Sequence, residues 1–287
     1  MDTTNHDCTV LVTSCDKYAD LLAPFEALFK KFWPDCPFER VLVTETEPRD
    51  PSPSPEQSAH IFTRTVACGV GGTWPDMLVA ALETIETPYV LMLCADYFLD
   101  APVPTRRLVA RLEQMKRLKA ANLRLIPNPK TFTPFACPGE DPDLPLGEYR
   151  KDTAYCVATQ TGFWARDFLL RLARSVANIW DFERLGSFMV ADEPRPLLVT
   201  PTREFPFSDV VHKGYWEKFG VALCEANGIA PDLAARGLPP LKVRLVEGIK
   251  KFVFFVFPTN WIVRVQNAFG LGAKETPCLC KARGARP

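Results

Sequence analysis

The sequence predicts an α/β fold with a mostly parallel central sheet flanked by helices. Residues Tyr89 to Cys94 are apolar without alternation, which is typical of a strand buried on both faces of a sheet. A strand at Cys8–Ser14, a helix at Tyr18–Phe32 and a strand at Arg40–Thr44 follow one another. This strand, helix, strand order favours parallel pairing with a right-handed crossover.

The individual elements follow from local patterns. Three- and four-residue spacing of apolar side chains predicts the helix at Tyr18–Phe32, which Pro34 ends. Thr73 is the predicted N-cap of a helix that begins near Pro75. Further predicted elements are strands at Ile61–Val66, Asn122–Ile126, Tyr155–Trp164 and Leu197–Thr200, helices at Thr105–Ala121 and Asp167–Ala177, a long loop at Pro127–Leu146, and an extended segment at Asn178–Ser187.

Composition narrows the class of protein. The chain has 287 residues, of which 47% are hydrophobic and 24% charged, as in an ordinary globular protein. The net charge of zero argues against nucleic acid as the main partner, because phosphate binding needs a basic surface. Ten cysteines are scattered singly through the predicted elements, and Met1–His6 is polar. We therefore expect reduced cysteines, no signal peptide and a cytoplasmic protein.

The last part of the chain differs from the rest. We expect one domain over residues 7–240 and an apolar, basic extension, helical in part, over residues 241–287. The apolar stretch at 241–268 is too short and too interrupted to span a membrane. From Lys242 onward there are nine Lys or Arg and two Glu. This composition suits a segment that lies on an anionic membrane surface, or equally a terminal helix packed on the domain with a basic tail.

Polar residues gather where the predicted strands end. In a parallel sheet these ends form the ligand crevice. Several carboxylates without a paired nucleophile and histidine indicate group transfer, in which one acid binds Mg²⁺ or Mn²⁺ and another takes a proton from the attacking hydroxyl. A turn or cap aspartate is the alternative interpretation of Asp96. The candidate residues at the strand ends are Ser14, Asp16, Glu45 and Asp96, and Asp181 and Glu183 come from the second half.

Several motifs resemble a known family. They are TSCDKYADLLAPFEALFKKFWPDCPF, VLVTE, WPDMLVAALETIETPYVLMLCADYFL, TQTGFWARDFLLRLA and IWDFE, within Cys8–Trp216. The chain is similar to bacterial nucleotide-sugar glycosyltransferases of the GT-A fold, which is Rossmann-like, from surface-polysaccharide gene clusters (capsule or lipopolysaccharide). The resemblance implies that Asp16 and Glu45 lie near the base and ribose of a sugar nucleotide. It also implies that Cys94-Ala95-Asp96 stands at the metal-binding motif.

One departure from the family pattern concerns the metal. Similar proteins tend to have two adjacent acids at this motif, whereas Ala95 precedes Asp96 here. Whether Mn²⁺ or Mg²⁺ is required is therefore open. His212 stands where some glycosyltransferases supply a late histidine ligand, and an ordinary surface or hydrogen-bonded histidine is the alternative.

The resemblance also suggests a catalytic base and a donor contact. Asp181 and Glu183 are the candidate catalytic acids, and Glu183 matches the position of the family's base better. On an extended segment they would point to opposite sides, and the alternative is that both are cap or surface acids. Trp74 and Asp76 are expected at the crevice mouth, with Asp76 on the donor sugar, or else at a simple helix start.

The leading hypothesis is a glycosyltransferase that moves a sugar from a nucleotide-diphosphate sugar to a glycan or lipid-linked acceptor, with inversion. We expect it in the cytoplasm, peripheral on the inner face of the membrane. A nucleotidyltransferase is the alternative enzyme, which the lack of a basic glycine-rich loop after the first strand weakens. A catalytically inactive glycan-binding or scaffold protein is the alternative outside enzymes, and Ala95 favours it.

Overall fold

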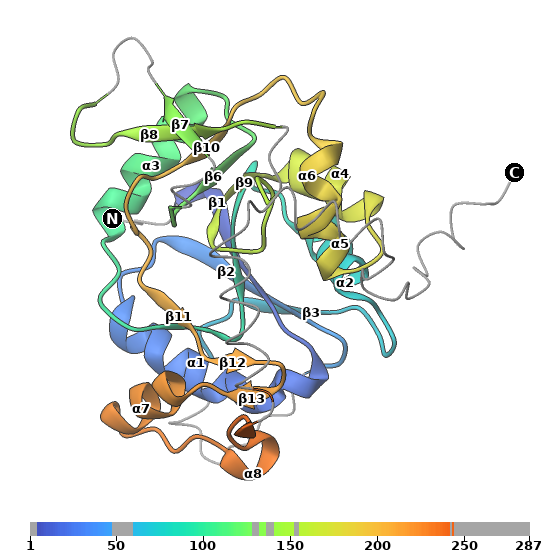
Figure 1. The fold of residues 1–287 in the computed structure, drawn as a ribbon, viewed down its shortest axis with the longest axis vertical. Helices are drawn as coiled ribbons and strands as arrows, with labels where there is room; N and C mark the ends of the chain where they lie inside the picture. The colour runs from blue at the N-terminus through green and yellow to red at the C-terminus, as the bar shows by residue number, and fades with distance from the viewer. Residues whose placement is uncertain are drawn as a thin grey trace, which may run out of the picture.

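A nine-stranded sheet runs through the part of the chain that the computed structural model describes, residues 5–47, 60–127, 132–135, 141–151, 155–241 and 243 (Figure 1). Its strands are β1 (Asn5–Thr13), β2 (Phe38–Thr44), β3 (Arg64–Ala67), β4 (Tyr89–Cys94), β6 (Asn122–Arg124), β7 (Phe132–Phe135), β8 (Leu146–Tyr149), β9 (Gly162–Ala165) and β10 (Leu197–Val199). Two small strand pairs join β5 (Tyr97–Leu99) to β11 (Phe207–Asp209), and β12 (Val211–His212) to β13 (Tyr215–Trp216).

The strand order in the large sheet is β3-β2-β1-β4-β9-β6-β10-β8-β7. Strands β1, β2, β3 and β4 are parallel, and β10 is parallel to β6. Only β9 and β8 run against the other strands of this sheet, since β9 is antiparallel to both β4 and β6 and β8 to both β10 and β7. The predicted mostly parallel α/β sheet is confirmed.

The order of the strands reverses at β1. From β1 the chain adds β2 and then β3 on one side, and later adds β4 on the other. Loop backbone bonds hold the strand ends together, because Ser14 N donates to Val43 O (2.9 Å) and Ala95 N donates to Thr13 O (2.9 Å). Ligands of open α/β sheets bind at such a reversal, outside the carboxyl ends of the strands. The carboxyl ends of β1 and β4 are therefore the place to look for a site.

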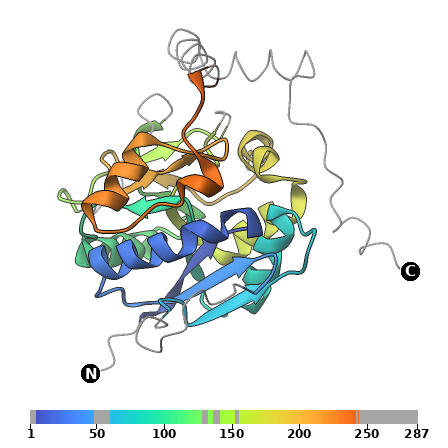
Figure 2. The ribbon, with the colours of Figure 1, turned by 90° about the horizontal axis from the view of Figure 1, so that it is seen from below.

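Helices cover the sheet. Figures 1 and 2 show α2, α4, α5 and α6 together on one side of the molecule. The helices α1, α7 and α8 form a second group, beside the small strands β11, β12 and β13. The helices are α1 (Ala19–Phe32), α2 (Trp74–Thr84), α3 (Thr105–Arg117), α4 (Arg166–Ser175), α5 (Ile179–Arg184), α6 (Gly186–Met189), α7 (Lys218–Ala226) and α8 (Leu233–Arg236), with a 3-10 turn η1 (Asp16–Tyr18). None of the helices in the described ranges is long and apolar enough to cross a membrane.

The core explains why these segments fold as they do. Val90, Leu91 and Met92 of β4 are fully buried, as the unbroken apolar run predicts. Phe25 and Phe29 of α1 form a chain of ring contacts with Trp33, the C-cap of the helix. Burial of such aromatic side chains is worth about 1.5–3 kcal/mol each, so this face fixes α1 against the sheet.

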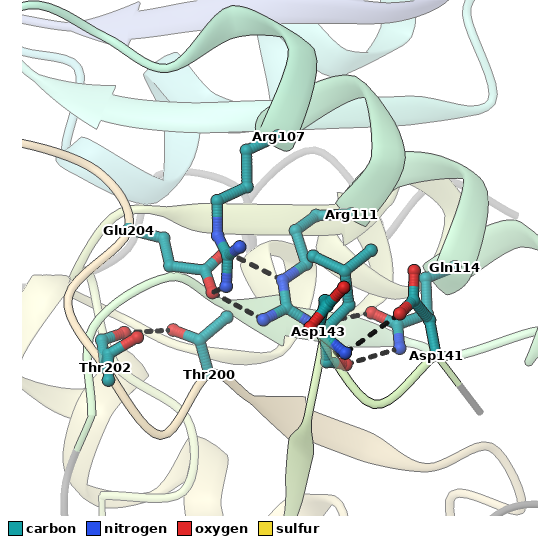
Figure 3. A network of polar contacts seen from close by, with 9 residues as sticks. Arg107, Arg111, Gln114, Asp141, Asp143, Thr200, Thr202 and Glu204 are labelled. Carbon is teal, nitrogen blue, oxygen red and sulfur yellow. Dashed lines mark hydrogen bonds and ion pairs between the residues drawn. The ribbon is translucent and has the colours of Figure 1, made fainter.

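A buried polar network links α3 to the chain that leads into β11 (Figure 3). Arg111 is fully buried, and its Nε donates to Glu204 Oε2 at 2.7 Å while its Nη2 donates to Oε1. Arg107 Nη2 donates to Glu204 Oε1 at 2.7 Å. Arg111 Nη1 also bonds to Gln114 Oε1 (2.7 Å) and to Leu144 O (2.8 Å). The network therefore holds three separate segments together.

The structure corrects several predicted elements. The segment at Asn178–Ser187 is not extended, because it forms α5 and the start of α6, with Asn178 as N-cap. The strand predicted at Tyr155–Trp164 begins only at Gly162, and the one at Ile61–Val66 begins at Arg64. The predicted loop at Pro127–Leu146 contains β7, which pairs with β8. Apart from residues 241 and 243, the extension at 241–287 lies outside the described residues.

Candidate active site

The loops after β1 and β2 are bonded to each other. Asp16 N donates to Glu45 Oε2 at 3.0 Å, and Thr46 donates to the Asp16 carboxylate from its N (3.1 Å) and its Oγ1 (3.0 Å). The structure thus brings together Asp16 and Glu45, and it adds Thr46, which the sequence analysis did not single out. Ser14 is buried beside them, and its Oγ has no hydrogen-bond partner among the described residues. A buried hydroxyl of this kind is suited to bond a ligand or a water.

Trp74 joins the start of α2 to the same crevice. Its Nε1 donates to Thr13 Oγ1 at 3.3 Å, and its ring meets Phe182 of α5 edge-on, with 5.1 Å between centroids. Asp76 makes a capping box, in which its Oδ2 accepts from Thr73 N (2.9 Å) and Thr73 Oγ1 (2.7 Å). These bonds give Asp76 the alternative role considered above, that of starting a helix.

Asp96 faces a second aspartate that sequence analysis missed. Strand β11 pairs with β5, so that Asp209 lies opposite Tyr97, and Val210 N donates to Asp96 O at 3.0 Å. Burial, together with the negative charge of Asp209, raises the pKa of Asp96 to about 7. Burial raises the pKa of Asp209 to about 6. The Val211 amide, which donates to Asp209 Oδ1 at 3.3 Å, and the charge of His212 both act against this rise in the pKa.

Glu183 belongs to the same cluster of acids. Three carboxylates, those of Asp96, Glu183 and Asp209, act electrostatically on the buried thiol of Cys94 at the end of β4. Burial is the main cause that raises the pKa of this thiol far above its ordinary value, and the three negative charges add to it. Acids from the turn after β4, from α5 and from β11 therefore all lie within electrostatic range of Cys94.

The carboxylate of Glu183 is oriented by one residue. Thr159 donates to its Oε1 from both the backbone N (2.8 Å) and Oγ1 (2.7 Å). Both bonds fall on one oxygen, so Oε2 has no donor among the described residues. A carboxylate fixed in this way can accept a proton from a bound hydroxyl through Oε2.

Asp181 lies differently from Glu183, although both are on α5. Its N donates to Asn178 Oδ1 (2.9 Å), its Oδ2 accepts from Asn178 Nδ2 (2.8 Å), and Arg184 lies 3.6 Å from its Oδ1. Asp181 is buried. Its contacts are those of a residue in the first turn of a helix, and only Glu183 is oriented by the loop at 155–161, which we call the crevice loop.

Arg236 brings a positive charge to the crevice from the far end of the described chain. On α8, its Nη2 and Nε donate to Asp20 at 2.6 and 2.7 Å, and its guanidinium stacks on Tyr18 at 4.4 Å from the ring centroid. Its positive charge opposes the rise in the pKa of Asp96 without cancelling it. Burial, followed by the charge of Asp96, raises the pKa of Tyr18 to about 12. Neither residue carries a local sequence signal of function.

A metal held by protein side chains alone does not fit this crevice. Among the described residues, no three or more His, Cys, Asp or Glu lie close enough together to hold an ion. The charge of His212 opposes the rise in the pKa of Asp209, whereas His212 is not among the groups that shift the pKa of Asp96. Two carboxylates, Asp96 and Asp209, still suit an Mg²⁺ or Mn²⁺ ion whose other ligands are water and substrate phosphates.

The sequence matches no protein-family profile, and no curated protein sequence matches it. Solved structures of similar shape include the mannosyltransferase PcManGT from Pyrobaculum calidifontis in complex with GDP-Man and Mn²⁺, at 14% identity and TM-score 0.47, covering 75% of this chain and 60% of that one. S. aureus TarS 1–349 with UDP-GlcNAc has 13% identity and TM-score 0.36, covering 77% and 65%. A cytidylyltransferase from Leptospira borgpetersenii serovar Hardjo-bovis has 9% identity and TM-score 0.41, covering 83% and 99%. This chain thus spans less than two thirds of the first two, and likeness at this level does not identify a reaction.

Proposed function

We propose that this chain is a glycosyltransferase that moves a sugar from a nucleotide-diphosphate sugar to an acceptor hydroxyl. The observation that carries the proposal is the convergence of Asp96, Asp209 and Glu183 on the Cys94 thiol at the point where the strand order reverses. Two of these carboxylates, Asp96 and Asp209, have raised pKa values, which is typical of sites that await a ligand or a cation.

The two halves of the crevice take different parts of the substrates. In the donor half, the nucleoside lies against Asp16, Glu45 and Ser14, whose carboxylates and hydroxyl suit ribose and base. Trp74 closes this half at the start of α2. The diphosphate then extends toward Asp96 and Asp209, with the guanidinium of Arg236 nearby.

A divalent cation, Mn²⁺ or Mg²⁺, is part of the proposal. Asp96 and Asp209 would hold it, and His212 would support Asp209. When bound, such an ion neutralises negative charge on the leaving diphosphate. A bound cation would lower the raised pKa values of both aspartates, because its positive charge stabilises their ionised forms.

Glu183 is the proposed base. Its Oε2 takes the proton of the acceptor hydroxyl as that oxygen attacks the anomeric carbon of the donor sugar. The bond from this carbon to the diphosphate oxygen breaks, and the electron pair leaves with the nucleoside diphosphate. One displacement on the face opposite the leaving group inverts the anomeric configuration. Thr159 keeps Oε1 occupied, so the proton goes to Oε2.

The acceptor and location complete the proposal. We assign the acceptor to a glycan or lipid-linked precursor of a surface polysaccharide, and the site of action to the cytoplasmic face of the membrane. The basic and apolar composition of residues 241–268 supports contact with that surface.

The test uses the purified full chain with UDP, GDP, CDP and TDP sugars and, in parallel, with the nucleoside triphosphates UTP, GTP, CTP and TTP, each with and without Mn²⁺. A bound donor raises the melting temperature in proportion to its affinity. We expect one nucleotide class to stabilise the protein, slow hydrolysis of that donor to sugar and nucleoside diphosphate, and loss of both in Asp96→Ala. Stabilisation by a nucleoside triphosphate with release of pyrophosphate would instead identify a nucleotidyltransferase. Binding without hydrolysis above a boiled control would identify an inactive binding protein.

A further inference from the structure

Large apolar side chains are exposed together on α5 and α6. Within ten residues, Trp180 is 64% exposed, Leu185 40%, Phe188 51% and Met189 44%. We call these four residues the α5–α6 patch. Burying such side chains in the core would stabilise the fold, so their exposure on two adjoining helices indicates a surface that meets something apolar.

The patch and the proposed base belong to the same short helices. Trp180 lies one helical turn before Glu183 and Arg184, so these side chains are neighbours on α5. Buried bonds fix the helices to the crevice loop, because Ser187 Oγ donates to Glu183 O (3.0 Å) and accepts from Val157 N (3.2 Å). The position of the patch relative to Glu183 is therefore set by the fold.

The chemistry around the patch narrows what it takes. Trp180 and Phe188 present ring faces, but Leu185 and Met189 beside them offer neither a ring face nor a hydrogen bond to a sugar, so half of the patch is aliphatic. Arg184 directly precedes Leu185 in the chain; its Nη2 lies 3.6 Å from Asp181 Oδ1, while its Nε is buried with no hydrogen-bond partner among the described residues. A positive group and a base beside an aliphatic surface suit an amphiphile with an anionic head group.

We propose that the α5–α6 patch holds the apolar chain, alkyl or isoprenoid, of the acceptor, while its polar head group reaches Glu183. This inference rests on the proposed function and names its acceptor class. A second copy of the chain is the less suitable occupant. The patch offers on the order of 400 Å², about half of the roughly 800 Å² per partner that a stable protein interface buries.

Photo-crosslinking locates the chain directly. The full protein is irradiated with dodecyl phosphate that carries a diazirine at the end of its alkyl chain, and tryptic peptides are mapped. We expect the label in residues 175–184 and 185–203, and we expect excess dodecyl phosphate, but not inorganic phosphate, to remove it. Labelling mainly in residues 219–236 or 252–264 would overturn the proposal, because the chain would then lie on α7–α8 or on the apolar C-terminal stretch.

Phe188→Ser and Phe219→Ser form a matched pair, because Phe219 of α7 is 53% exposed and lies outside the patch. Phe188→Ser should lower the affinity for dodecyl phosphate roughly tenfold, which is about 1.4 kcal/mol, because the phenyl ring no longer covers the alkyl chain. Phe219→Ser should leave it unchanged, and both variants should keep the parent's melting temperature and donor binding. Equal effects of the two substitutions would contradict the proposal.

The readout separates this inference from the function on which it rests, because labelling needs no turnover. Donor hydrolysis without label on α5–α6 would overturn the acceptor site alone. Label on α5–α6 without any donor binding would overturn the transferase, and with it the acceptor role of the patch. A dimer in sedimentation that Phe188→Ser dissociates would assign the patch to a subunit interface and overturn the proposal.

Discussion

Two groups of acidic residues in this molecule differ in what surrounds them. Glu204 is enclosed by Arg107 and Arg111 (Figure 3), whose hydrogen bonds outweigh the effect of burial and hold its pKa below the ordinary value. Asp96 and Asp209 face each other at the crevice, and their pKa values are raised to about 7 and about 6. The first group has its cations built in and holds segments together. Among the described residues the second group has no ion pair of this kind, and its burial costs the fold stability, which is expected where a ligand completes the site.

The largest expected effect concerns Glu183, the acid that the crevice orients by one oxygen only. Glu183→Gln keeps the bonds from Thr159 to Oε1 but cannot accept a proton, so kcat should fall about 10²–10⁴-fold. KM for the donor should stay within a factor of about two. Steady-state kinetics with the donor class found by thermal shift measure both. Asp181→Asn is the control on the same helix, and an equal loss of kcat there would remove the distinction between the two acids.

The enclosed group should respond in stability and not in catalysis. Arg111→Met leaves Glu204 buried with one guanidinium fewer, and should lower the free energy of unfolding by about 3–5 kcal/mol. Urea denaturation measures this change. Arg107→Met is the matched control, because its side chain is 39% exposed and a partly exposed pair contributes about 1 kcal/mol or less. Similar losses in both variants would show that burial does not decide how much each arginine contributes to the free energy of unfolding.

Removing a charge from the pair Asp96 and Asp209 should raise stability, whereas removing one from the Glu204 network lowers it. Because the folded-state pKa of Asp96 exceeds its ordinary value of 3.8, folding is favoured below about pH 4 and loses stability as the pH rises toward 7. Asp96→Asn removes this penalty, so it should be more stable than the parent at pH 8 by on the order of 4 kcal/mol, and equally stable near pH 4. Urea titrations at both pH values in metal-free buffer measure it. For Glu204, with its lowered pKa, the contribution runs the other way and is lost as the pH falls.

The smallest expected effect separates a helix cap from a donor contact. Asp76→Ala removes half of the capping box at Thr73 and should cost about 1 kcal/mol of stability. Donor affinity in isothermal titration should stay unchanged. A large loss of donor affinity with little loss of stability would instead return Asp76 to the role that the family resemblance implies.

Sequence analysis predicted correctly those elements whose pattern lies within one short segment of the chain. The buried run of β4, the amphipathic α1 and the cap at Thr73 each lie within one short segment, and the structure has them where predicted. In Asn178–Ser187 the local pattern misled, because alternating aromatics are typical of a strand. In fact Phe182 packs on Trp74 inside the fold, while Trp180 is left outside on the same helix.

The acids at the crevice could be predicted only in part for the same reason. Asp96 directly follows a strong strand and was found. Asp209 and Arg236 reach the crevice through the pairing of β11 with β5 and through the docking of α8 on Tyr18. Such contacts join distant parts of the chain, and no spacing within the sequence encodes them.

The strand order also has a consequence for how the molecule is assembled during synthesis. Strands β1 to β4, with α1 and α2, lie within residues 5–94 and pair among themselves. They can therefore form while the ribosome is still adding the rest of the chain, and the loops that carry Asp16 and Glu45 form with them. The outer edge of β4 stays unpaired until β9 emerges, and Glu183 and Asp209 arrive later still. The nascent chain thus acquires the nucleotide half of its crevice first, and the half proposed for catalysis is completed last.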